Sequence, residues 1–216
     1  MLTLWAHCVI VILRMKIRVE GKPPDPPFFL VSNHLSYIDI IPLYRYIKCS
    51  FITQKGVGSW PVIGPMAKTM GLIFIDRSRK MDVARVNELI SDHLHDHQGI
   101  VLFPEGTTSD GKELLSFRPS LLQHPAVSDF PVHYCSITYR TSADDPHPSE
   151  SVCWWGGISF VNHFFKLAGN KKIYCILTFA NDTVHETDRK KLAEKLHQKI
   201  SNQFKPVSKL PKEQVN

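Results

Sequence analysis

The chain has 216 residues, enough for one domain with a sizeable hydrophobic core. Hydrophobic residues make up 43% of it, which is typical of a globular protein and excludes an intrinsically disordered chain. The net charge of +6 comes from basic residues near the two ends, which suit an anionic membrane surface, an acidic carrier protein, nucleic acid or simply a solvated helix face. Nucleic acid is disfavoured because no recognition motif is present. The five cysteines form no Cys-x-x-Cys pair, which indicates free thiols in a reducing compartment.

The N-terminal segment is apolar through residue 13 and is followed by the cations Arg14, Lys16 and Arg18. It is shorter than the about 20 residues that span a bilayer, and it lacks the leading charges and cleavage site of a signal peptide. We therefore expect residues 1–18 to form a membrane-surface helix with Trp5 as an interfacial anchor; an ordinary core helix is the alternative. Residues 19–204 are expected to form the folded domain, and residues 205–216 a polar basic tail.

Apolar runs alternate with amphipathic segments along the rest of the chain, which predicts a single α/β domain. We expect a central mixed, largely parallel sheet flanked by helices. The expected strands are Phe28–Ser32, Cys49–Thr53, Leu72–Ile75, Ile100–Phe103, Pro131–Tyr139, Val152–Gly157 and Ile173–Ala180. The expected helices are Tyr37–Ile47, Met81–His97, a short one around Leu121, Phe160–Leu167 and Glu186–Phe204.

The stretch from Asn33 to Asp39 lies where the first expected strand passes into a helix. His34 comes just before that helix and Asp39 falls in its first turn, so their side chains are able to meet. An aspartate beside an imidazole fixes the tautomer and stabilises the imidazolium form, as a general base requires. The alternative is structural, because Asp39 also stands where an acidic residue closes a capping box with Ser36.

Three other patterns in the sequence are incomplete. His93 and His97 have the spacing of metal ligands on one helix face, but no third ligand is evident, so no metal is expected. Residues 106–112 match most of a phosphate-binding loop, yet the hydroxyl residue that binds magnesium is replaced by Glu113. Ser109 is offset from the Gly-x-Ser-x-Gly pattern of serine hydrolases.

Chemically suggestive residues follow three of the expected strands: His34, Arg77 and Glu105 with Gly106. In open α/β sheets, ligands bind at the edge formed by the carboxyl ends of the strands. A base, a fixed cation and a glycine loop on one edge suggest attack by a hydroxyl on an ester while a phosphate is held nearby.

From about Val19 to Thr178 the chain resembles the glycerolphosphate and lysophosphatidic acid acyltransferase family. The order and spacing of the matching motifs make the resemblance specific. These motifs are Asn-His-x-Ser-x-x-Asp at 33–39, Gly-x-Ile-Phe-Ile-Asp-Arg at 71–77, Phe-Pro-Glu-Gly-Thr at 103–107, a looser proline-centred stretch at 130–132, and Trp60–Pro65.

The resemblance implies that His34 deprotonates an acceptor hydroxyl and that Asp39 orients His34. The acyl donor is then acyl-CoA or acyl-carrier protein, with no metal or organic cofactor. The resemblance also implies an acceptor-binding set: Asn33, Ser36, Lys55, Arg77, Glu105, Gly106, Thr107 and Arg118. Arg77 would hold the acceptor phosphate. The expected product is phosphatidic acid, made from lysophosphatidic acid in phospholipid biosynthesis at the cytoplasmic face of the cell membrane, with the protein peripheral or monotopic.

The sequence departs from the family pattern at Thr108, where many members carry arginine. The run from Thr107 to Gly111 together with Phe117 and Arg118 also resembles a branch that includes lyso-ornithine lipid acyltransferases. A lyso-ornithine or other lysolipid acceptor is therefore the alternative. From a different class, a non-catalytic lipid-binding protein is disfavoured by the intact His34 and Asp39, and a thioesterase or lipase lacks an identifiable nucleophile.

Overall fold

The computed structural model describes residues 2–54, 72–75, 88, 92 and 98–211. Their strands form one mixed sheet in the order β1-β7-β6-β2-β5-β3-β4, with β8 paired to β6. The strands are β1 (Met15–Glu20), β2 (Phe28–Ser32), β3 (Cys49–Gln54), β4 (Ile73–Ile75), β5 (Gly99–Leu102), β6 (Val132–Thr141), β7 (Ile173–Phe179) and β8 (Ser208–Lys209). The pair β6–β7 is antiparallel and the other pairings are parallel, so the predicted mixed, largely parallel sheet is confirmed.

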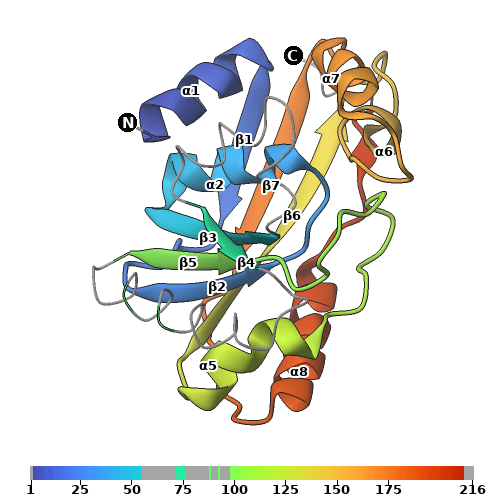
Figure 1. Ribbon diagram of the computed structural model, residues 1–216. Coiled ribbons are helices and arrows are strands. Elements are labelled where there is room, and N and C mark those ends of the chain that lie inside the picture. Colours follow the sequence, from blue (N-terminus) through green and yellow to red (C-terminus); the bar gives the residue numbers. More distant parts are fainter. Residues whose placement is uncertain (1, 55–71, 76–87, 89–91, 93–97, 212–216) are drawn as a thin grey trace.

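Helices cover both faces of the sheet (Figure 1). On one face lie α1 (Leu2–Ile12) and α2 (Ile40–Tyr46), preceded by a 3-10 turn at Tyr37–Asp39; on the other lie α5 (Gln123–Val127) and α8 (Arg189–Gln203), with a 3-10 turn at Pro119–Leu122. Two further helices, α6 (Pro148–Ser151) and α7 (Phe160–Ala168), lie between β6 and β7 in sequence. Among the described residues, no helix has both the length and the apolar character needed to cross a bilayer.

Strand β2 lies in the centre of the core because both of its faces are apolar. Phe28 and Leu30 pack toward α1 and α2, while Phe29 and Val31 pack toward α5 and α8. A strand buried on both faces reads as a continuous hydrophobic run, as the sequence does here. β5 is its parallel neighbour, so the loops that follow the two strands leave the same edge of the sheet.

The N-terminal helix is shorter than the expected 1–18 segment. It ends at Ile12, Arg14 has a positive φ of 49°, and Met15–Glu20 forms the edge strand β1 paired with β7. These residues form a strand because the apolar Met15, Ile17 and Val19 alternate with polar residues, and an alternation every second residue is typical of a strand. The cations expected to follow within the helical segment therefore lie outside α1: Arg14 is in the turn after it, and Lys16 and Arg18 are on β1.

The expected strand Val152–Gly157 is wrong: this segment is a loop that follows the short helix α6. Gly156 and Gly157 both have positive φ values, 68° and 76°, a conformation that a strand does not use. The indole N–H of Trp154 donates to the carbonyl of Ile158, just after this segment, and that of Trp155 donates to the carbonyl of Ser149 in α6, which holds the loop in place. The tail is also partly ordered, because Ser208–Lys209 forms β8. Apart from Glu88 and Asp92, the expected helix Met81–His97 lies outside the described residues.

Candidate active site

The turn after β2 is fixed by Asn33, which is fully buried. Its side-chain amide donates to the carbonyl of Ile137 at 3.0 Å and accepts the Ile137 N–H at 2.7 Å. The side chain of Asn33 thus extends the hydrogen bonding between β2 and β6 by one residue beyond Ser32, where the backbone pairing ends. Both polar atoms of the Asn33 side chain are hydrogen-bonded inside the protein, which gives this residue a positioning role; its expected contact with the acceptor stays a prediction.

Asp39 is fully buried and its two carboxylate oxygens receive several donors. Oδ2 accepts the backbone N–H of Leu35 at 2.7 Å and of Ser36 at 3.0 Å, and it lies 2.8 Å from Nδ1 of His34. Oδ1 accepts the hydroxyl of Tyr139 at 2.9 Å. The same carboxylate therefore bonds the first residues of the turn, as a capping box does, and also orients the imidazole.

The imidazole of His34 is held from two directions. With Nδ1–H donated to Asp39, the lone pair of Nε2 is left available as a base. The ring stacks on Phe103 from the loop after β5, with centroids 4.1 Å apart and planes 9° from parallel. His34 keeps 21% of its side chain exposed, so the fixed ring is still reachable by a reactant. The predicted pairing of His34 with Asp39 is confirmed by this geometry.

Glu105 lies behind His34 and is only 2% exposed. Its Oε1 accepts the backbone N–H of His34 at 3.3 Å, and Oε2 has no hydrogen-bond partner among the described residues. Burial raises the pKa of Glu105 to about 8, the bond from His34 opposes the rise, and the negative charge of Asp39 adds to it. Glu105 is therefore largely protonated at pH 7, and it supports the backbone of His34 instead of lining the pocket.

A pocket of about 410 Å³ opens beside His34. Its described lining is mostly apolar or aromatic and contains no lysine, arginine or acidic side chain. The lining residues come from five segments: His34, Tyr37 and Ile40; Phe51, Ile52 and Thr53; Leu72; Phe103, Gly106, Thr107 and Thr108; and Trp154 to Ile158. Such a cavity favours a hydrocarbon chain with its reactive end at His34.

Three loops are tied together around this pocket by backbone hydrogen bonds. The N–H of Ser109 donates to the carbonyl of His34 at 3.1 Å, and the N–H of Trp154 donates to the carbonyl of Leu35 at 2.8 Å. The hydroxyl of Thr108 donates to the carbonyl of Trp154. Gly106 has a φ of 71°, which lets the chain turn sharply between Phe103 and Thr107. The residue that departs from the family pattern, Thr108, therefore joins two walls of the pocket.

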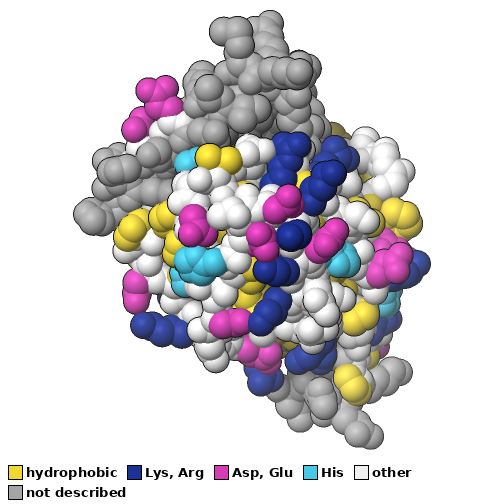
Figure 2. All heavy atoms as spheres, turned by 90° about the horizontal axis from the view of Figure 1, so that it is seen from below, with side chains coloured by type: hydrophobic (Ala, Val, Ile, Leu, Met, Phe, Trp, Pro, Cys, Tyr) yellow, Lys and Arg dark blue, Asp and Glu magenta, His cyan; other side chains and the backbone are white. Residues whose placement is uncertain are grey.

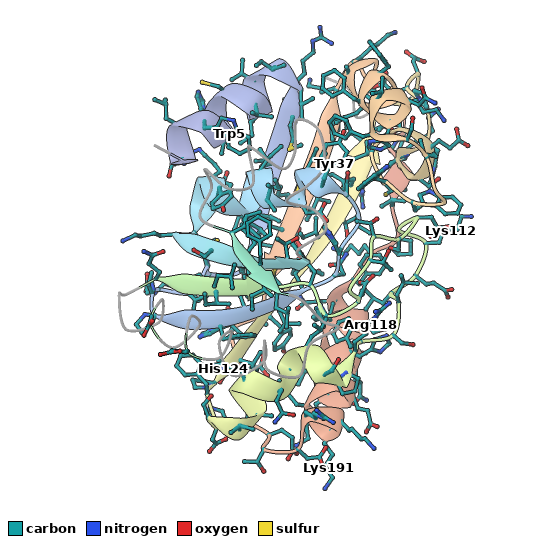
Figure 3. All side chains as sticks on the ribbon, viewed as in Figure 1. Trp5, Tyr37, Lys112, Arg118, His124 and Lys191 are labelled. Carbon is teal, nitrogen blue, oxygen red and sulfur yellow. The ribbon has the colours of Figure 1, made fainter. Side chains whose placement is uncertain are left out.

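The expected acceptor-binding residues do not all lie at the pocket. Gly106 and Thr107 line the pocket, whereas Ser36 is buried in the turn behind it. Arg118 does not line the pocket: its side chain is exposed, and Figure 3 places it beside α8, below the sheet, while Tyr37 lies above it. Its expected contact with the acceptor stays a prediction. Lys55 and Arg77 lie outside the described residues, although β4, which precedes Arg77 in sequence, ends at the same sheet edge as β5.

The rival chemistries find no support in the described part of the chain. The hydroxyl of Ser109 is buried and accepts the N–H of Gly111, so it is not paired with a base. The cysteines are free thiols; four are buried, and burial raises their pKa. No group of three metal-binding side chains occurs among the residues that the structure describes, and His93 and His97 lie outside them.

Sequence reasoning missed two groups of residues at the site. Tyr139 lies near the carboxyl end of β6, and nothing in the local sequence singles it out. The pocket wall from Trp154 to Ile158 was taken for a strand, although its paired glycines and tryptophans are a signal for a loop near a ligand.

Comparison with known proteins agrees with these motifs. A family model described as Acyltransferase matches residues 16–138. A lyso-ornithine lipid O-acyltransferase of Pseudomonas aeruginosa is 29% identical over 163 residues, which cover 76% of this chain and 62% of that protein. A lyso-ornithine lipid O-acyltransferase of Brucella abortus is 30% identical over 198 residues, covering 86% of this chain and 74% of that protein. A 1-acyl-sn-glycerol-3-phosphate acyltransferase of Neisseria meningitidis is 27% identical over 201 residues, covering 89% and 76%.

The fold also matches a solved structure. The crystal structure of the 1-acyl-sn-glycerophosphate acyltransferase PlsC from Thermotoga maritima superposes with a TM-score of 0.64, covering 94% of this chain and 78% of that one. At 19% identity this likeness shows a shared fold.

Proposed function

Because the chain belongs to the Acyltransferase family, we propose that it transfers a fatty acyl group from a thioester donor to the free hydroxyl of a lysolipid. The observation that carries the proposal is the pair of His34 and Asp39, 2.8 Å apart, at the mouth of an apolar pocket. A base at the end of a cavity that suits a hydrocarbon chain is what acyl transfer between lipids requires.

In this reaction Nε2 of His34 removes the proton of the acceptor hydroxyl as its oxygen attacks the thioester carbonyl carbon. The new C–O bond forms, the C–S bond breaks, and the proton passes from His34 to the departing thiolate. Asp39 stabilises the imidazolium in between through its bond to Nδ1. The chain's own side chains supply the proton transfer, so no metal or organic cofactor is proposed.

For the acceptor we propose lysophosphatidic acid, acylated at its sn-2 hydroxyl to give phosphatidic acid. This proposal depends on Arg77, since a guanidinium is able to bind a phosphate group through paired hydrogen bonds. A second acceptor, lyso-ornithine lipid, is favoured by a different observation. Two lyso-ornithine lipid O-acyltransferases are 29% and 30% identical to this chain, and Thr108, which departs from the family pattern, uses its hydroxyl to bind the loop at Trp154.

For the donor we propose acyl-CoA or acyl-carrier protein, and for the location the cytoplasmic face of the cell membrane. A lysolipid acceptor resides in a bilayer, and the described part of the chain offers a short apolar helix, α1, with Arg14 just behind it. An anionic leaflet would attract that cation.

The test is an assay of the purified protein with labelled acyl-CoA or acyl-carrier protein and a panel of lysolipids, including lysophosphatidic acid and lyso-ornithine lipid. We expect acylation of lysophosphatidic acid, lost in His34→Ala and strongly reduced in Arg77→Ala. If the protein ignores lysophosphatidic acid but acylates lyso-ornithine lipid, the assignment of Arg77 is wrong and the role of His34 stands. No acylation of any lysolipid with either donor would contradict the proposed function.

A further inference from the structure

The outward face of α7 is apolar. Val161, Phe164 and Phe165 are 59%, 46% and 69% exposed, while His163 and Leu167 on the opposite face are buried. A helix on the surface of a globular protein normally turns polar residues outward. The part of α7 that faces away from the protein therefore has the character of a contact surface.

This helix is joined to the wall of the pocket beside His34. It directly follows the segment Trp154–Ile158, in which Trp155 is 42% exposed and lines the pocket. Phe160 packs on Tyr37, with ring centroids 5.2 Å apart. Burial lowers the pKa of His163, so its neutral ring accepts the Tyr37 hydroxyl at Nδ1 and donates from Nε2 to the Cys153 carbonyl. A group that binds the outer face of α7 is thus brought close to the pocket wall at Trp155.

The helix α1 also exposes apolar side chains. Leu4, Val11 and Ile12 on α1 are 68%, 61% and 73% exposed. The segments that follow the two helices are in contact, because the guanidinium of Arg14 donates to the carbonyl of Asn170 at 3.4 Å. Figure 1 shows both helices at the same end of the molecule, away from α5 and α8.

The charges around α7 indicate what it contacts. Residues 160–173 contain Lys166, Lys171 and Lys172 and no acidic residue, and the exposed Arg14 lies alongside. The acids nearby are Glu150 on α6 and Asp144 and Asp145 in the loop before it. Asp145 is buried, and its carboxylate accepts the backbone N–H groups of Lys171 and Lys172 at 2.9 and 3.2 Å. The opposite end differs. There two lysines of α8 pair with acids, Lys195 with Glu186 and Lys199 with Asp182, both at 2.7 Å. Figure 2 shows basic and acidic side chains interspersed on that face.

We propose that α7, together with α1, binds an anionic bilayer, with Phe164 and Phe165 inserted among the lipid headgroups and the lysines facing their phosphates. Exposed aromatic and aliphatic side chains beside lysines are typical of helices that lie in a membrane interface. The pocket wall at Trp155 then faces the lipid, so that a lysolipid enters the pocket sideways from the membrane. This last step rests on the proposed function, whereas membrane binding by α7 does not.

The first test measures binding to sedimented vesicles made of equal parts of phosphatidylcholine and phosphatidylglycerol. We expect the double variant Phe164→Ser/Phe165→Ser to partition at least about tenfold less than the wild type, since each buried phenylalanine contributes on that order. The matched control is Val127→Ser: Val127 is 70% exposed on α5, at the other end of the molecule, and its loss should leave the partition unchanged.

The second test addresses charge. The variant Lys166→Gln/Lys171→Gln should bind these vesicles about fivefold less for each lysine removed, and should bind pure phosphatidylcholine vesicles as the wild type does. Equal losses on both kinds of vesicle would contradict the proposed contact between the lysines and anionic headgroups.

The third test separates membrane delivery from chemistry. The Phe164→Ser/Phe165→Ser variant should acylate a short-chain lysolipid dissolved as monomers at the wild-type rate, and a long-chain lysolipid embedded in vesicles more slowly. If the wild type acylates no lysolipid, the proposed function fails, and vesicle binding still decides the role of α7. Unchanged vesicle binding by the phenylalanine variant overturns the proposal. So does a wild-type dimer, seen by sedimentation velocity, that the variant abolishes, because a second copy of the chain would then cover α7.

Discussion

The hydroxyl of Tyr139 donates a 2.9 Å hydrogen bond to Oδ1 of Asp39, a residue 100 positions earlier in the chain. Both side chains are fully buried. Because Oδ2 of the same carboxylate bonds His34, Tyr139 near the carboxyl end of β6 is a positioning residue for the base. The bond also joins the central sheet to the turn that carries His34 and Asp39.

Tyr139→Phe should lower kcat about 10- to 100-fold while leaving KM nearly unchanged, since a hydrogen bond to a charged group contributes about 1.5–3 kcal/mol. The pocket lining is untouched by this change, so acceptor binding should persist. Steady-state kinetics check this, with Tyr46→Phe as the control, because Tyr46 is 41% exposed on α2. A higher KM with an unaltered kcat would contradict the positioning role.

His34→Ala should reduce turnover by roughly 10²–10⁴, the usual contribution of a general base, and Asp39→Asn should be severely impaired as well. The two effects should not add in the double variant, because the residues act as one unit. Rates are to be compared with circular dichroism spectra, which should be unchanged for His34→Ala. A folded and fully active His34→Ala protein would rule out the mechanism.

Asn33→Ala should act on stability. It leaves the N–H and the carbonyl of Ile137 buried and unpaired, which costs about 1–3 kcal/mol for each group. We expect a lower urea midpoint of unfolding and, for the fraction that is folded, a KM near that of the wild type. An unchanged midpoint together with a raised KM would instead indicate that Asn33 contacts the acceptor.

Glu105 makes stability depend on pH. Its pKa is raised to about 8 by burial, so the folded state binds this proton more tightly than the unfolded chain does. Its contribution is therefore greatest at low pH and is lost as the pH rises from about 4.5 to 8. Glu105→Gln keeps an oxygen for the N–H of His34 but does not ionise. Between pH 5.5 and 8, the wild type should lose on the order of 2–3 kcal/mol of unfolding free energy relative to this variant. Urea titrations at the two pH values measure the difference, and parallel curves would contradict it.

Much of the fold was predictable because its central elements are locally determined. The run Phe28–Ser32 is apolar on both faces and so reads as a buried strand, and α7 and α8 lie within about three residues of their expected bounds. The errors occurred where local and distant interactions compete. Met15–Glu20 is short and follows an apolar helix, and its pairing partner β7 lies near the other end of the chain. The segment after α6 has the apolar composition of a strand, but its indoles and glycines shape a loop around the pocket.

The sequence by itself determined the pair of His34 and Asp39, because their bond spans a single turn and needs only the local backbone. It also determined the edge of the sheet where the motifs gather, since parallel strands place their carboxyl ends together. Only the tertiary structure decided that Tyr139 completes this pair, that Asn33 and Glu105 support the turn from behind, and that Arg118 is not among the described residues that line the pocket. Those relationships depend on β6, on burial and on loops packed from distant parts of the chain. Burial and long-range pairing are properties of the assembled fold, and neither a motif nor its spacing encodes them locally.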